Sequence, residues 1–119
     1  MSAEPHAWNP LGDDRPALTR IVLQRCDAAH VHPIGALDIA TVPMLERQLR
    51  DVREAGFRRL IVDLRGLSFM DSTGLRLALK WDAAARQDGF EISFVPGEPA
   101  VQRVFEITGT SGQLPFIHS

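Results

Sequence analysis

Four consecutive residues, Asp71, Ser72, Thr73 and Gly74, place an acid, two hydroxyls and a glycine directly after a short apolar run. A helix cap needs only one such side chain, because a single Asp or Ser oxygen accepts hydrogen bonds from the first-turn N–H groups. A nucleophile elbow requires G-x-S-x-G and an aspartic protease requires Asp-[Ser/Thr]-Gly, and neither spacing is present. Two uses remain open: capping, and a hydroxyl that accepts a phosphate, which adds about −1.5 to −2 charges.

Histidine, the usual catalytic base, occurs only at positions 6, 30, 32 and 118. His30 and His32 share one face of a predicted strand, but no nearby Cys or third His completes a zinc set. No P-loop and no G-x-G-x-x-G pattern is present. The single cysteine, Cys26, is expected to be a small buried hydrophobe. We therefore expect no metal, no cofactor and no catalytic residues, and the protein is not expected to be an enzyme.

Composition limits the partners. The chain has 119 residues, a formal net charge of −2 and a pI near 6.0, which gives a nucleic-acid partner no electrostatic support. The first residues lack the pattern of a secretory signal, and no apolar run reaches the ~18 residues that cross a bilayer. We expect a soluble, cytoplasmic protein that does not insert into a membrane. Residues 1–18 are predicted to be a flexible N-terminal arm in which Trp8 could pack or dock.

Hydrophobic periodicity predicts the elements that must position the Asp71–Gly74 stretch. The expected strands cover 19–26, 30–35, 58–64 and 90–95, with residues 27–29 linking the first two as a hairpin. The expected helices cover 40–55, 72–87 and 98–107, and Gly56 and Gly89 are expected to end the first two. This order predicts an α/β fold: a single small domain over 19–119, with a mixed sheet of about four strands and crossover helices packed against it.

The second predicted helix has an apolar face that covers an unusually wide arc of its surface. Its core-facing candidates are Leu75, Ala78, Leu79 and Ala85, with Leu77, Trp81 and Ala84 on an adjoining arc. Either Trp81 fills space over the core, or Leu77 and Trp81 form an exposed patch that anchors a partner. Asp82 occupies a position where an apolar residue is expected.

The chain resembles a known family at these residues. The run Ile61-Val62-Asp63-Leu64 and the following Leu67-Ser68-Phe69-Met70-Asp71-Ser72-Thr73-Gly74-Leu75 are similar to the signature of STAS domains, specifically the small bacterial anti-sigma factor antagonists. The resemblance extends to Gly35-Ala36-Leu37-Asp38, Gly89-Phe90-Glu91-Ile92 and Val101-Gln102-Arg103-Val104-Phe105 with Thr108-Gly109. It covers roughly residues 19 to 118.

The resemblance implies a phosphorylation-controlled partner switch that regulates transcription. Unphosphorylated protein would bind an anti-sigma factor of the GHKL serine-kinase type and free a sigma factor. Phosphorylation of Ser72 by that partner would release it, and a phosphatase would reverse the step. Asp38 and Asp71 would lie beside Ser72, and Thr73 is the second choice as acceptor. The alternative is a STAS subunit of a membrane lipid ABC transport complex.

The resemblance also implies which residues form the phosphorylation site and the docking surface around it. The predicted phosphosite and docking surface comprises Asp38, Asp71, Ser72, Thr73, Gly74, Leu77 and Trp81. For Asp38, a role in the kinase reaction or its docking competes with an N-cap role for the helix predicted from Ala40. The sequence does not separate these two roles.

Overall fold

Four strands form the central sheet of the structure, a computed structural model that describes residues 19–23 and 28–117, the first of these ranges by its backbone alone. The strands are β1 (Thr19–Leu23), β2 (Ala28–Pro33), β4 (Arg59–Asp63) and β6 (Glu91–Val95), in the spatial order β1-β2-β4-β6. β1 is antiparallel to β2, whereas β2, β4 and β6 are parallel, with Leu60 opposite Ile92. The predicted mixed sheet of about four strands is confirmed. The arm expected over 1–18, Trp8 and Cys26 lie outside the described residues.

A second, smaller sheet was not predicted. β3 (Gly35–Leu37) pairs in parallel with β5 (Leu67–Met70), and a single 3-10 turn, η1 (Leu64–Gly66), leads from β4 into β5. The carboxylate of Asp63 caps this turn by accepting from the N–H of Arg65 at 3.0 Å. The small sheet therefore continues the chain beyond the carboxyl ends of β2 and β4, where parallel sheets place their sites.

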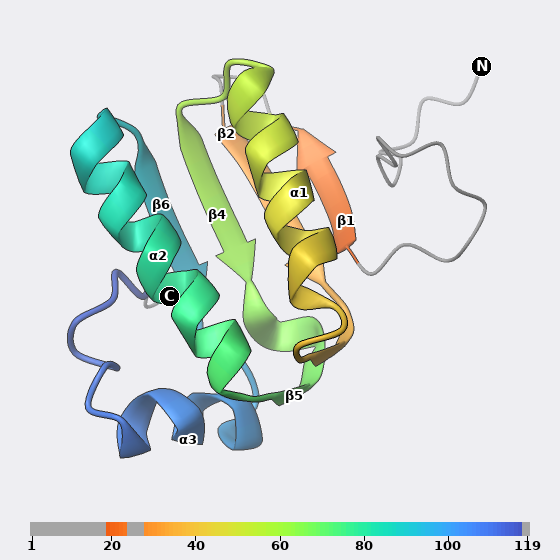
Figure 1. The fold of residues 1–119 in the computed structure, drawn as a ribbon, viewed down its shortest axis with the longest axis vertical. Helices are drawn as coiled ribbons and strands as arrows, with labels where there is room; N and C mark the ends of the chain where they lie inside the picture. Colours follow the sequence, from red (N-terminus) through yellow and green to blue (C-terminus); the bar gives the residue numbers. More distant parts are fainter. Residues whose placement is uncertain (1–18, 24–27, 118–119) are drawn as a thin grey trace.

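Two helices cover one face of the main sheet, as Figure 1 shows. They are α1 (Val42–Glu54) and α2 (Ser72–Asp88), while α3 (Pro99–Ile107) packs at the end near β5. α2 ends at Gly89, whose φ of 80° is the left-handed conformation that glycine adopts at low cost. None of the helices within the described ranges is long and apolar enough to span a bilayer.

Two predicted boundaries are wrong by a few residues. α1 begins at Val42 rather than near residue 40, because residues 38–41 form a separate turn in which Asp38 C=O accepts from the N–H of Val42 at 2.8 Å. The predicted hairpin link over 27–29 is also misplaced. Ala28 and Ala29 are already part of β2: both pair with β4, and Ala29 also pairs with Leu23 on β1.

The core lies between the sheet and the two covering helices. Alternate strand residues such as Val31, Leu60 and Val62 are almost fully buried there, because successive side chains of a strand point to opposite faces. α3 contributes Phe105, which is 1% exposed and packs edge-to-face on Phe116 with ring centroids 5.1 Å apart. This core holds the start of α2 in place against β3 and β5.

Candidate functional site

The N-terminus of α2 is built by Asp71, which is its N-cap. The Asp71 backbone is extended, and its carboxylate accepts from the N–H groups of Thr73 at 2.9 Å and Gly74 at 3.4 Å. The same oxygen also accepts from the Thr73 hydroxyl. That hydroxyl bond, and then the two N–H groups, hold the pKa of Asp71 below its ordinary value despite partial burial. Asp71 is therefore a charged N-cap, and its Oδ1 accepts all three of these hydrogen bonds.

Ser72 and Thr73 differ in how free their hydroxyls are. Ser72 is exposed at the first position of α2, and within the described part of the chain its hydroxyl makes no hydrogen bond. Thr73 is only partly exposed, and its hydroxyl donates to Asp71. A reacting group in solvent can therefore reach the Ser72 hydroxyl without breaking an internal hydrogen bond.

Gly74 lets the first turn of α2 approach the small sheet closely. A Cβ added at this position would lie 2.6 Å from Met70 Cγ and 3.0 Å from Leu37 Cδ2. Both neighbours are buried, so neither side chain can move far without disturbing the core. Gly74 is thus a packing residue beneath Ser72, and its own surface is buried.

Asp38 lies beside this turn because β3 and β5 end side by side. The N–H of Asp71 donates to Leu37 C=O at 3.2 Å, which joins the two chain segments just before Asp38 and Ser72. Asp38 Oδ1 accepts from the N–H of Ala40 at 3.0 Å. The carboxylate therefore orders the turn before α1; the N-cap residue of α1 is Thr41. The structure places the Asp38 turn beside the Asp71–Thr73 segment, which is the proximity that the family resemblance implies.

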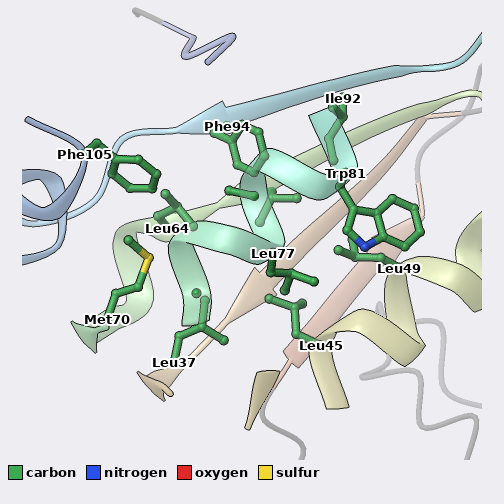
Figure 2. Close-up of a pocket in the computed structure, with 13 residues that line it drawn as sticks. Leu37, Leu45, Leu49, Leu64, Met70, Leu77, Trp81, Ile92, Phe94 and Phe105 are labelled. Carbon is green, nitrogen blue, oxygen red and sulfur yellow. The ribbon is translucent and has the colours of Figure 1, made fainter. Parts of the chain in front are cut away.

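Leu77 and Trp81 do not form an exposed patch, and this alternative is wrong. They are 6% and 8% exposed, and Figure 2 shows both pointing into the same apolar cavity as Leu45 and Leu49 of α1. The reason is that α2 packs against α1 as well as the sheet, so a wide arc of its surface is covered. The cavity measures about 20 Å³, which is room for about one water molecule. The other alternative, in which Trp81 fills space over the core, is confirmed.

The unexpected Asp82 also lies inside. It is 6% exposed, and its carboxylate forms an ion pair with Arg86 one turn further on, at 3.0 Å. A buried carboxylate needs such a partner, because removing a charge from water is costly. Asp82 belongs to the fold and not to the surface beside Ser72.

Two exposed apolar side chains near Ser72 were not predicted from the sequence. Ile39, in the turn after Asp38, is 75% exposed, and Phe69, three residues before Ser72 in β5, is 51% exposed. The sequence offered a weak signal for Ile39, an isolated apolar residue between Asp38 and the start of α1. Phe69 could not be placed without knowing that residues 67–70 form an edge of a two-stranded sheet.

The two histidines lie in a separate polar cluster. They are half-buried on the sheet face opposite α1 and α2, with ring centroids 6.1 Å apart, and His32 Nδ1 lies 3.3 Å from Asp63 Oδ2. Burial, and then the neighbouring His32, lower the pKa of His30. Burial would raise the pKa of Asp63, but hydrogen bonds from the Arg65 side chain and N–H outweigh it and lower that pKa. Across residues 28–117, no group of three His, Cys, Asp or Glu side chains is arranged to hold a metal.

The arrangement at α2 is suited to modification and binding. Ser72 presents an exposed hydroxyl at a helix N-terminus with no hydrogen bond to any described residue, and the carboxylate of the preceding residue, Asp71, caps the helix. A general base must lie within hydrogen-bond reach of the hydroxyl it activates, and no side chain in the described ranges makes that contact with Ser72. Among the described residues, the neighbouring Asp71 carboxylate bonds to Thr73 and Gly74 and not to the Ser72 hydroxyl.

Known proteins are similar to this chain in sequence or in fold. The chain is 41% identical over 75 residues to the anti-sigma-B factor antagonist of Staphylococcus aureus (strain NCTC 8325), covering 63% of this chain and 69% of that relative. The solved structure of the anti-sigma factor antagonist SpoIIAA in its unphosphorylated form has a TM-score of 0.70 at 20% identity, covering 85% of this chain and 89% of its own. The phosphorylated form of the Bacillus protein SpoIIAA has a TM-score of 0.64 at 19% identity, covering 85% and 92%.

The family assignment follows from the extent of the match. The family model described as the STAS domain matches residues 20–119, which include both sheets, all three helices and the Asp71–Gly74 turn. The similarity of the solved structures confirms the α/β fold. The chain belongs to the STAS domain family.

Proposed function

We propose that this protein is an anti-sigma factor antagonist in a phosphorylation-controlled partner switch in the cytoplasm. Its unphosphorylated form binds an anti-sigma factor and so frees a sigma factor, and phosphorylation of Ser72 releases the partner. The observation that carries the proposal is the exposed, unbonded Ser72 hydroxyl at the start of α2 in a STAS domain. The relatives reported above are named as anti-sigma factor antagonists, so the alternative of a transporter subunit is not favoured.

The geometry favours Ser72 over Thr73 as the phosphoacceptor. A kinase must align the acceptor oxygen with the γ-phosphate, and its active site must reach that oxygen from solvent. Thr73 would have to give up its bond to Asp71 and leave its partly buried position. Ser72 needs neither change, and its backbone is already fixed by the Asp71 cap.

The two aspartates have distinct parts in the proposal. Asp71 holds the first turn of α2, so that it presents Ser72 in one orientation. Asp38 orders the neighbouring turn through Ala40 and Thr41, and this structural role is compatible with a second role in docking the kinase. We propose that the partner covers both turns at once, because they lie side by side across the β3 and β5 ends.

Ile39 and Phe69 are the candidate apolar contacts of this interface. They are the large exposed apolar residues closest in the chain to Asp38 and Ser72: Ile39 lies in the turn that follows β3, and Phe69 lies in β5. Interface cores are enriched in aromatic side chains surrounded by polar residues, which matches Phe69 with Ser68 and Ser72 nearby in sequence. They replace the Leu77 and Trp81 patch as the docking candidates.

A single phosphate is sufficient to switch such an interface. An unpaired charge buried in an interface costs about 3–5 kcal/mol. Because each 1.4 kcal/mol corresponds to a tenfold change in Kd, binding would weaken by roughly two to three orders of magnitude. The free domain keeps its fold, since the phosphate on the exposed Ser72 stays in water.

The test is phosphorylation by the cognate GHKL-type kinase and ATP, followed by mapping of the phosphate by mass spectrometry. We expect one phosphate, on Ser72, in the wild type and in a Thr73→Val control, and none on Ser72→Ala. A phosphatase that restores binding completes the cycle. Phosphate at the wild-type level on the Ser72→Ala variant would overturn the assignment, as would phosphate found only on other residues.

A further inference from the structure

We propose that Arg76 binds the phosphate group of phosphorylated Ser72 and holds it against the outer surface of α2. This inference rests on the proposed function, because it concerns the phosphorylated form of the same site. Arg76 is four residues after Ser72 on a continuous helix. Side chains at that spacing lie on the same face, with Cβ atoms about 5–6 Å apart.

The order of the two groups along α2 is the favourable one. An anion near the N-terminus of a helix and a cation one turn later both interact well with the helix dipole, and this order stabilises more than the reverse. A guanidinium also matches a phosphate with two parallel hydrogen bonds. Between Ser72 and Leu79, Arg76 is the single charged residue, so it is the one cation that α2 offers at this distance.

Arg76 is available for this contact. It is exposed, and it forms no ion pair with any described residue. Lys80, the other basic residue that lines the same groove, contacts the carboxylate of Glu46, as does Arg50. The Arg76 side chain lines a groove of about 210 Å³ between α1 and α2, which is also lined by Thr73, the residue that follows Ser72.

The contact between Arg76 and the phosphate of Ser72, called the clamp below, offsets the negative charge around the site. Among the described residues, the carboxylates of Asp71 and Asp38 lie near the start of α2, and the Glu46–Lys80 pair lies farther along it. A phosphate on Ser72 therefore arrives next to two acids, which favour its monoanion. Arg76 opposes them, keeps the phosphate dianionic and fixes it on the surface that the anti-sigma factor would cover.

The test uses phosphoserine inserted biosynthetically at position 72, so that no kinase is needed. A 31P NMR titration gives the second pKa of the phosphate in the wild type, in Arg76→Gln and in a control, Arg47→Gln, which removes the same charge from an exposed arginine of α1. A unit charge about 5 Å away in water changes a pKa by about half a unit. We expect Arg76→Gln to raise the phosphate pKa by about that amount and Arg47→Gln to leave it unchanged.

The outcomes separate the two proposals. An unchanged phosphate pKa in Arg76→Gln overturns the clamp, and so does an equal rise in Arg47→Gln, because the effect would then be a general loss of charge. Far-UV circular dichroism of each variant checks that α2 is intact. Failure of a kinase to modify Ser72 would instead overturn the proposed function, while this titration would still report whether Arg76 contacts the phosphate.

Discussion

Replacing Trp81 by alanine is expected to damage the fold and to leave the docking surface untouched. The side chain is 8% exposed and meets Phe90 edge-to-face, with ring centroids 6.1 Å apart. A buried tryptophan removes about 150–250 Å² from water, which at about 25 cal/mol per Å² amounts to roughly 4–6 kcal/mol. Its Nε1–H is buried and has no hydrogen-bond partner among the described residues, and relief of such a group returns about 1–3 kcal/mol. The expected net loss is about 3 kcal/mol, a large part of the 5–15 kcal/mol typical of a domain.

Urea unfolding followed by circular dichroism measures this loss. Ile39→Ala is the matched control, because Ile39 is 75% exposed and its truncation should change the free energy of unfolding by less than about 0.5 kcal/mol. Partner affinity is then measured on folded protein, where Trp81→Ala should bind like the wild type and Ile39→Ala about tenfold more weakly. If Trp81→Ala were as stable as the wild type and bound poorly, the indole would be a surface anchor and our placement of α2 would be refuted.

Three further perturbations test individual contacts. Phe69→Ala should weaken anti-sigma factor binding at least tenfold in a titration calorimeter with an unchanged melting temperature; a normal Kd would remove Phe69 from the interface. Gly74→Ala should lower stability by about 1–3 kcal/mol, because its Cβ would overlap Met70, whereas Gly112→Ala, with open space around it, should not. Asp71→Asn keeps a capping oxygen but loses the charge. Since the folded pKa of Asp71 is lowered, the stability advantage of the wild type should be present at neutral pH and disappear as the pH falls below about 4; a gap that stays constant during acid titration would contradict this cause.

The elements with strong local signals were predictable from the sequence. β4 is a short apolar run, and α2 combines an acid cap, an apolar period and a terminal glycine, so both were placed within one or two residues. The Asp71–Gly74 turn was recognised because capping chemistry is local. Its proximity to Asp38 followed from the family resemblance, and the structure shows the parallel pairing of β3 with β5 that produces it.

The features that were missed depend on contacts between distant segments. β3 and β5 have three and four residues, which is too short for periodicity to separate a strand from a loop. The burial of Leu77 and Trp81 depends on where α1 packs beside α2, which the pattern of α2 alone does not contain. The difference between the Ser72 and Thr73 hydroxyls is set by one hydrogen bond to Asp71, and adjacent residues of similar chemistry give no sequence signal for it.

The most direct test of the central claim is the affinity of the anti-sigma factor for the protein with and without a phosphate on Ser72. Titration calorimetry would compare wild type, Ser72→Ala and protein carrying phosphoserine at position 72. We predict that wild type and Ser72→Ala bind alike, and that phosphoserine weakens binding by roughly 100- to 1,000-fold with an unchanged circular dichroism spectrum. Equal affinities of the phosphorylated and unphosphorylated forms would contradict the partner switch.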